Sequence, residues 1–238
     1  MIRIGTDAHD TPWYVDEKTV LWLPRPIPGL TGQRVVDLSP AGNHGRCEID
    51  TSVSDGAITS TYTSYSDNDS GVNCGNSLSL AFSRPVTVAA WIRDTYAGSP
   101  SNWGCFLSRG ADGTKYGWRL IDYNDTLAWG TSAGWIAVPS GTWAPRGAGW
   151  HHHCGTYDGT TIRLYRDGVD VTASTGQIGS INFGIPGNNT PLYLCARSVS
   201  GAAPTRQWSC DLADIVIANR AYPPDRVAGM NAETRGNY

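Results

Sequence analysis

The chain has 238 residues, of which only 16% are charged, and its formal net charge is −3. Its arginines are spread along the sequence and not clustered, so we expect no surface that follows a nucleic-acid phosphate backbone. No window approaches the roughly 18 apolar residues of a membrane-spanning helix, and the acidic N-terminus lacks the apolar run of a signal peptide.

The N-terminal residues 1–19 show no regular apolar pattern, and we expect a free arm or an edge segment there. From residue 20 onward, short apolar runs alternate with turns rich in glycine and proline, of which the chain has 28 and 14. This pattern is typical of an all-β sandwich or barrel. The run PVTVAAWIR at 85–93 alternates and predicts a central strand. Two Asp-Gly pairs predict tight hairpins, Asp158-Gly159 and Asp167-Gly168.

Helix signals are confined to PPDRVAGMNAE near the C-terminus. Proline suits the first turn of a helix, and Asp225 would lie near its positive end. We expect the final residues TRGNY to form a loose tail. The predicted organisation is therefore an arm or edge segment at 1–19, one β domain at 20–222, and a short helix and tail at 223–238.

Five segments follow one another along the chain: VVDLSPAGNHG, SDNDSGVNCGNSLSL, VTVAAWIR, WHHHCGTYDGTTIRLYRDGVDV and DLADIVIANRAYPPDRVAGM. In this order they resemble the conserved steps of laminin-G-like jelly-roll domains, within the concanavalin A-like lectin/glucanase superfamily. The resemblance extends from about Val20 to Met230. It implies an all-β, two-sheet antiparallel jelly-roll sandwich, with Trp91 and Trp150 at core positions.

The sequence departs from that family pattern in places. His153 and Cys154 replace small apolar residues, and Cys195 and Cys210 stand where family members often have glycine. Residues 97–149 are longer and richer in tryptophan than the pattern, so we expect specificity to differ there. A looser resemblance, carried by LWLPRPIPGLTG and VVDLSPAGNHG, is to laminin-G-like proteins of phage structural gene clusters.

The six cysteines form no CxxC pair, which argues against a zinc site. Most lie in predicted strands, where a free thiol behaves as a small buried apolar group. Cys195 and Cys210 are the best disulfide candidates, because they flank a Gly-Ala-Ala-Pro turn and would face each other across a hairpin. Synthesis in the cytoplasm argues against such a bond.

Two motifs suggest catalysis, and both are incomplete. GTSAG at 130–134 matches the nucleophile elbow, but no helix follows it as that elbow requires. Glu48 and Asp50 resemble half of a glycosidase motif whose second glutamate is replaced by Val53, so the pair of carboxylates is missing. We therefore expect no catalytic residues and no enzyme activity, with a degenerate glycoside hydrolase as the least favoured alternative.

Calcium is the metal that the resemblance favours, because related jelly rolls hold it with carboxylates and loop carbonyls. Asp37 and Asp214 are the preferred ligands in matching segments, and the alternative is that they cap turns. His151 and His153 would share one strand face, but without an evident partner we expect ordinary strand histidines. Less favoured calcium candidates in these segments are Asn43, Asp67 and Asp69.

Aromatic residues of the central region are candidates for stacking on sugar rings. The predicted ligand-binding residues, for a glycan or a protein partner, are Trp103, Trp135, Trp143, Tyr116 and Tyr123. Trp118 and Trp129 are expected in the core instead. The alternative for most of these rings is burial in the core or in a subunit contact.

The sequence thus predicts a non-enzymatic binding or structural module. We expect a protein of the phage virion surface, a decoration or capsid- or tail-associated protein made in the host cytoplasm. Its expected partners are other virion proteins or copies of itself in a symmetric homo-oligomer, together with cell-surface glycans. The alternative is a free, extracellular lectin-like carbohydrate-binding protein.

Overall fold

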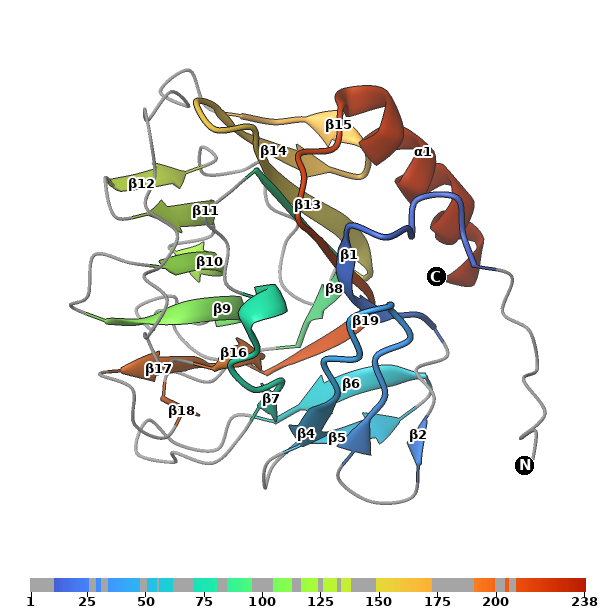
Figure 1. Ribbon diagram of the computed structural model, residues 1–238, viewed down its shortest axis with the longest axis vertical. Coiled ribbons are helices and arrows are strands. Elements are labelled where there is room, and N and C mark those ends of the chain that lie inside the picture. Colours follow the sequence, from blue (N-terminus) through green and yellow to red (C-terminus); the bar gives the residue numbers. More distant parts are fainter. Residues whose placement is uncertain are drawn as a thin grey trace.

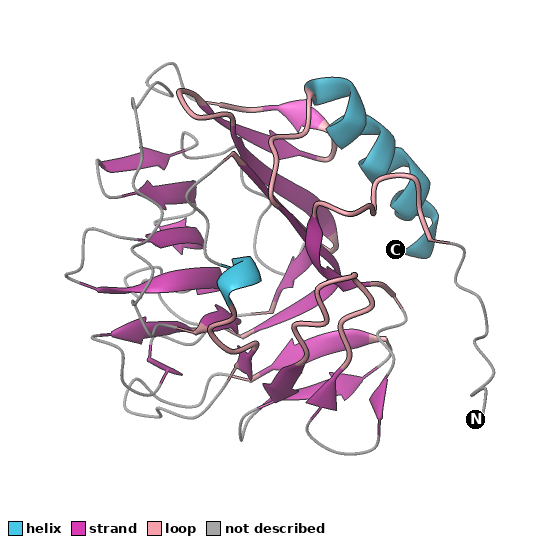
Figure 2. Cartoon of the chain, viewed as in Figure 1, coloured by secondary structure: helices cyan, strands magenta, loops and turns pink. Residues whose placement is uncertain are grey.

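The structure is a computed structural model, and Figure 1 shows two layers of strands with one α-helix on the side of the first layer. It describes residues 11–25, 29–30, 34–47, 51–54, 56–61, 71–80, 85–95, 105–112, 117–123, 126–131, 134–137, 149–172, 191–199, 204–205 and 209–238. The view by secondary structure shows how far strands dominate both layers (Figure 2). The predicted all-β sandwich of two antiparallel sheets is confirmed.

The first sheet has the order β15-β14-β13-β8-β19-β6-β5, and β1 pairs with the second half of β19. Its strands are β1 (Thr19–Leu23), β5 (Thr51–Ser54), β6 (Ala57–Ser60), β8 (Val86–Asp94), β13 (His151–Tyr157), β14 (Ile162–Arg166), β15 (Val169–Asp170) and β19 (Cys210–Ala218). The predicted central strand is therefore β8, which lies between β13 and β19.

The second sheet has the order β12-β11-β10-β9-β16-β7-β4-β3-β2, and β17 joins β9 in parallel and β18 in antiparallel pairing. Its strands are β2 (Gly29–Leu30), β3 (Arg34–Val35), β4 (Gly45–Cys47), β7 (Val72–Asn73), β9 (Cys105–Asp112), β10 (Gly117–Tyr123), β11 (Thr126–Thr131), β12 (Gly134–Ala137), β16 (Leu192–Leu194), β17 (Arg197–Val199) and β18 (Pro204–Thr205). A short 3₁₀ turn, η1, covers Leu78–Leu80.

Both Asp-Gly hairpins form where the sequence predicts them. Asp158-Gly159 connects β13 to β14, and Asp167-Gly168 connects β14 to β15. The second pair has φ values of 50° and 81°. A two-residue hairpin turn of type I′ needs positive φ at both central positions, and Asp-Gly is one of the few pairs that adopts it readily.

The first sheet carries an apolar cluster on each of its faces. Its inner face packs against the second sheet in a core that includes Ile92, Leu164 and Ile217. Its outer face carries a second apolar cluster that includes Tyr165, Tyr222 and Met230. Because both faces of the sheet are covered at β19, this strand is buried along its whole length. Most of its residues are accordingly apolar.

The helix α1 (Pro224–Thr234) covers part of that outer face, as Figure 1 shows. It begins with Pro224 and carries Asp225 in its first turn, as predicted from the sequence. The prediction of a loose C-terminal tail is wrong. The 3₁₀ turn η2 (Arg235–Asn237) follows α1, and the ring of the terminal Tyr238 stacks on Trp91 with 4.3 Å between centroids. Within the part of the chain that the structure describes, no helix is long and apolar enough to cross a membrane.

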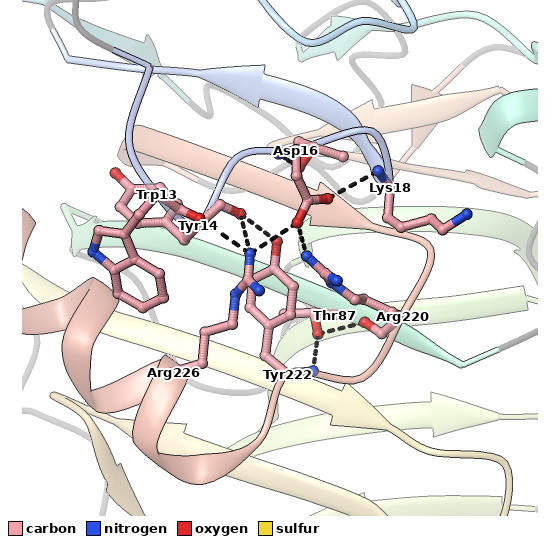
Figure 3. A network of polar contacts seen from close by, with 9 residues as sticks. Trp13, Tyr14, Asp16, Lys18, Thr87, Arg220, Tyr222 and Arg226 are labelled. Atoms are coloured by element: carbon pink, nitrogen blue, oxygen red, sulfur yellow. Dashed lines mark hydrogen bonds and ion pairs between the residues drawn. The ribbon is translucent and has the colours of Figure 1, made fainter.

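Residues 11–18 also lie on the outer face, held by a polar network around Asp16 (Figure 3). The Asp16 carboxylate forms ion pairs with Arg220 and with Arg226, the latter at 3.1 Å. The Tyr222 hydroxyl donates to the Tyr14 carbonyl at 2.6 Å. This part of residues 1–19 is therefore a docked segment leading into β1, whereas residues 1–10 lie outside the described residues.

We expect Asp16→Asn to lower the free energy of unfolding by about 1–2 kcal/mol, because two partly buried guanidinium groups lose their anionic partner. The midpoint of urea denaturation measures the change, and added salt should reduce the difference from the wild type. Glu17→Gln is the matched control, since Glu17 is the exposed neighbouring acid. Equal midpoints for the two variants would contradict a stabilising role for the Asp16 network.

Candidate functional site

The second sheet presents its side chains in alternating rows, one toward the core and one away from it. Cys47, Val72, Leu194 and Leu107 are cross-strand partners on β4, β7, β16 and β9, and all four are buried in the inner core. Since successive residues of a strand point to opposite faces, the neighbouring row lies on the outer face of this sheet.

That neighbouring row, which we name the outer row, runs from β3 to β12. It crosses eight strands of the second sheet in unbroken register, and Leu30 on β2 is the further partner of its first residue. Its partners are, in order, Arg34, Arg46, Asn73, Tyr193, Ser108, Arg119, Gly130 and Trp135. The row is polar and aromatic where its neighbour is apolar.

Exposure along the outer row differs from one end to the middle. The side chains of Arg34 and Arg46 are exposed and that of Asn73 is half-buried. Tyr193 and Ser108 are buried, and the Ser108 hydroxyl donates to the Ala196 carbonyl at 2.8 Å. The accessible described part of the row is therefore its arginine end, on β3, β4 and β7.

Two of the predicted ligand-binding residues belong to strands of this sheet. Trp135 in β12 is a member of the outer row, and Tyr123 in β10 is four residues from Arg119, so its position lies on the same face. Trp129 is instead the partner of Leu120, in the row of Leu107, so its position lies on the other face of the sheet. Trp103, Trp143 and Tyr116 lie outside the described residues, so the ligand-binding prediction stays a prediction.

The carboxylate of Asp37, a predicted calcium ligand, is buried and accepts four hydrogen bonds from the protein. Its Oδ1 accepts from the backbone N–H groups of Trp22 and Ser39, both at 2.8 Å. Its Oδ2 accepts from the Ser39 hydroxyl at 2.8 Å and from the Asn43 N–H at 2.6 Å. Both oxygens are thus occupied by the loop that Asp37 closes, which favours the capping role over calcium.

The same loop is tied to two other parts of the chain. The Asn43 amide donates to the Val20 carbonyl at 2.7 Å and to the Ser79 hydroxyl at 2.8 Å. The Asp37 N–H donates to His44 Nδ1 at 3.1 Å. The segment VVDLSPAGNHG therefore contains a hydrogen-bonded loop, which we name the Asp37 loop. It connects β1 to the η1 region.

Asp214, the other predicted calcium ligand, lies at an irregularity of β19 and has φ of 44°. Its Oδ1 accepts from the Arg25 N–H at 2.6 Å, and its Oδ2 accepts from the Tyr238 hydroxyl at 2.8 Å. Burial raises the pKa of Asp214, although these hydrogen bonds oppose the rise. The carboxylate thus anchors the chain after β1 and the C-terminus to the same strand.

No group of three or more His, Cys, Asp or Glu side chains among the described residues is arranged to hold a metal ion. Asp37 and Asp214 bind separate segments of the chain and share no recorded partner. Calcium binding through these two residues stays a prediction.

The histidine run has a partner that the sequence did not reveal. His151 and His153 share a face with 6.4 Å between ring centroids, as predicted, and His151 Nδ1 lies 2.7 Å from Asp167 Oδ2. The other Asp167 oxygen accepts from the His152 N–H at 3.0 Å. The signal was present in the Asp167-Gly168 turn, which the β13–β14 hairpin brings back to the start of β13.

His152 points to the opposite face, beside Trp91, with 5.6 Å between ring centroids. Burial lowers the pKa of His152 to about 4, with Asp167 opposing the shift. The folded protein therefore resists protonation of this ring, whereas the unfolded chain takes up a proton near pH 6.5.

We expect stability to fall as the pH is lowered from about 6.5 to about 4, by roughly 3 kcal/mol from His152 alone, because only the unfolded state binds the proton there. Denaturant midpoints measured at several pH values test this. His152→Phe should reduce the dependence, because it removes this buried ring. A wild-type midpoint that stays constant across this window would contradict the expectation.

Trp150 is half-buried and lies between two arginines, although a core position was expected for it. The guanidinium groups of Arg25 and Arg93 lie 5.3 and 5.1 Å from the centre of its ring. Arg25 also lies 4.6 Å from the ring of Tyr238, and Arg93 pairs with Asp211 at 2.6 Å. Such cation–π contacts hold the C-terminus against the first sheet.

The catalytic motifs have no supporting geometry in the described chain. Gly130 lies near the end of β11 and Gly134 begins β12. Because these two strands pair antiparallel, the motif GTSAG joins two strands of a hairpin and does not form a strand-to-helix elbow. Glu48 and Asp50 lie outside the described residues.

The profile of the concanavalin A-like lectin/glucanases superfamily matches residues 66–228. The chain belongs to this superfamily. The laminin-G-like resemblance is thereby confirmed. The matched range of this lectin/glucanase-superfamily domain does not include the Asp37 loop. A comparison with curated protein sequences found no match.

Solved structures resemble this lectin/glucanase-superfamily domain at low sequence identity. A Trypanosoma rangeli sialidase in complex with sialic acid is 13% identical, with a TM-score of 0.64 over 92% of this chain and 33% of the sialidase. The binding domain of Paraclostridial Mosquitocidal Protein 1 is 16% identical, with a TM-score of 0.63 over 91% of this chain and 52% of that one.

A third similar structure is domain 4 of AbnA, an extracellular arabinanase from Geobacillus stearothermophilus, in complex with arabinotriose. It is 18% identical, with a TM-score of 0.52 over 88% of this chain and 86% of that domain. This superfamily domain thus spans about a third of the sialidase chain and about half of the mosquitocidal protein chain. At these identities the likeness shows the fold alone.

Proposed function

We propose that the chain is a non-enzymatic recognition module that binds glycans on the outer face of its second sheet. The observation that carries the proposal is the outer row. It places exposed arginines at one end and the Trp135 position at the other on a single sheet face. Arginine donates several hydrogen bonds to sugar hydroxyl or carboxylate groups, and an aromatic ring stacks on a sugar face.

The other layer supports the same assignment by exclusion. The first sheet packs on the second sheet through its inner face, and α1 and residues 11–18 cover part of its outer face. On the second sheet, the described residues offer exposed side chains at the arginine end of the outer row. Similar structures support a binding role too, since one is the binding domain of Paraclostridial Mosquitocidal Protein 1 and another is a domain in complex with arabinotriose.

A glycan array with the full chain tests the proposal, followed by affinity measurements on the best ligand. Arg46→Ala and Trp135→Ala should each weaken binding by about tenfold or more, because each removes a direct contact. Arg163→Ala is the matched control, because that arginine is exposed on β14 of the first sheet and pairs with Asp170. Equal weakening by Arg163→Ala, or no glycan bound, would overturn the proposal.

The proposed setting is the surface of a phage particle, as a decoration or capsid- or tail-associated protein. Its support is the resemblance of the segment from Leu21 to Gly45 to laminin-G-like proteins of phage structural gene clusters. Mass spectrometry of gradient-purified particles should find the chain in a fixed ratio to the capsid protein. If it remains in the soluble fraction and still binds glycan, the free lectin-like alternative holds.

Absence of enzyme activity is tested on the glycans that the array identifies. Incubation with each ligand should release no reducing sugar above the level of a heat-denatured control. Turnover that depends on a residue of this chain would overturn the non-enzymatic part and favour the glycoside hydrolase alternative.

A further inference from the structure

The structure brings two buried cysteines from different sheets into direct contact. Cys195 follows β16 in the second sheet, and Cys210 is the first residue of β19 in the first sheet. Their Sγ atoms lie 3.2 Å apart, with both thiols free and both residues 0% exposed. The pair therefore bridges the two layers through the core, and not across the hairpin predicted from the sequence.

We infer that Cys195 and Cys210 are an oxidation site, which forms a disulfide between the two sheets when the protein meets a disulfide oxidant such as oxidised glutathione. A disulfide has an S–S length of about 2.05 Å, so the sulfur atoms need to approach by roughly 1 Å. A rotation at each side chain can supply this approach while the strands stay in place.

The backbone around the pair fixes the position of both thiols. Cys195 has φ of 60°, an uncommon value for a residue with a side chain, and its N–H donates to the Phe106 carbonyl at 2.6 Å. Cys210 pairs with Ser60 on one side and Asp94 on the other. The held geometry reduces the entropy that closing the bond has to remove.

The chemistry balances with glutathione as the oxidant. One cysteine thiolate attacks a sulfur of oxidised glutathione, which forms a mixed disulfide and releases one glutathione thiolate. The second cysteine thiolate attacks the protein sulfur of that mixed disulfide and releases the second glutathione. Two electrons pass to the oxidant, and the two thiol protons end on the two glutathione molecules.

Burial sets when this reaction occurs. It raises the pKa of the Cys210 thiol, and the contact with Cys195 raises it further, so the reactive thiolate is scarce in the folded protein. Oxidation is therefore expected to be fast during folding and slow once the core has closed. Once formed, the bond is shielded from reductants by the same burial.

The test refolds the full chain from denaturant with a glutathione redox mixture, and in parallel with a reductant alone. Both samples are alkylated in denaturant and measured by intact mass and peptide mapping. We expect four of the six cysteines to be alkylated in the oxidised sample, six in the reduced sample, and the link to map to Cys195 and Cys210. The unfolding equilibrium constant of the oxidised protein should be lower by roughly a hundredfold, as for other loops of about 15 residues.

Cys210→Ala and the matched Cys154→Ala, at a buried thiol on the outer side of the first sheet, serve as variants. The first should abolish the link, and the second should retain it. Six alkylated cysteines in the oxidised wild type would overturn the inference. So would a link between Cys47 and Cys74 in its place, or an oxidised protein no more stable than the reduced one.

Discussion

Replacing Trp91 by alanine is expected to lower the free energy of unfolding by about 3–5 kcal/mol, the usual cost of removing a large buried ring. Trp91 is 3% exposed, and its ring stacks on Tyr238. Its indole N–H donates to the Thr234 hydroxyl at 2.7 Å. The substitution thus removes apolar burial and the two contacts that hold the end of the chain on β8.

Chemical denaturation measures this effect, and two further variants divide it. Trp91→Phe keeps an aromatic ring and loses the hydrogen bond, so we expect a cost of about 1–2 kcal/mol. Trp13→Ala is the control for removing a tryptophan, because Trp13 is 54% exposed. If Trp91→Ala costs no more than Trp13→Ala, Trp91 does not hold the C-terminal segment in place.

Replacing Asp37 by asparagine is expected to lower the free energy of unfolding by about 2–4 kcal/mol. The carboxylate accepts four hydrogen bonds, three of them from backbone N–H groups. Asparagine has nearly the same shape but turns one acceptor into an NH₂ donor, which then faces buried donors without a partner. The Asp37 loop should lose hydrogen bonds of the Asp37 side chain, and the connection of β1 to the η1 region should weaken.

The control for this variant is Asp158→Asn, because Asp158 also caps a turn but is exposed to solvent. Its expected cost is below about 1 kcal/mol. A calcium chelator provides the second comparison. If the chelator lowers the wild-type midpoint and has no effect on Asp37→Asn, Asp37 is a calcium ligand and the capping role is wrong.

Local sequence patterns predicted the parts of the fold that depend on neighbouring residues. The alternation of PVTVAAWIR gave a central strand, and the Asp-Gly pairs gave the β13–β14 and β14–β15 turns. The helix at the C-terminus followed from its proline and Asp225. Each of these signals acts within a few residues, so the sequence contains it directly.

Contacts between distant segments were beyond that reach. The tail was expected to be loose because TRGNY has no apolar pattern, yet Tyr238 binds Trp91, 147 positions earlier in the chain. The sequence predicted that Cys195 and Cys210 face each other across a hairpin. They do lie close together, but the contact joins the end of β16 in the second sheet to β19 in the first. The partner of His151 was missed because Asp167 reaches it only through the hairpin fold.

The candidate site shows the same division. The sequence indicated aromatic positions such as Trp135 and Tyr123, and strand register then placed both on one sheet face. The arginine end of the outer row was not predicted, because Arg34 and Arg46 become neighbours only when β3 and β4 pair. For Asp37 the sequence left calcium binding and turn capping as alternatives, since its backbone donors become neighbours only in the folded loop.

The position of β19 has a consequence for synthesis of the protein. This strand follows the other strands of the first sheet in the chain, yet it lies between β8 on one side and β6 and β1 on the other. A nascent chain that lacks it exposes the open edges of β8, β6 and β1, which are templates for unwanted pairing. Completion of the first sheet therefore waits until β19 has been synthesised, and the many long-range pairings favour slow folding.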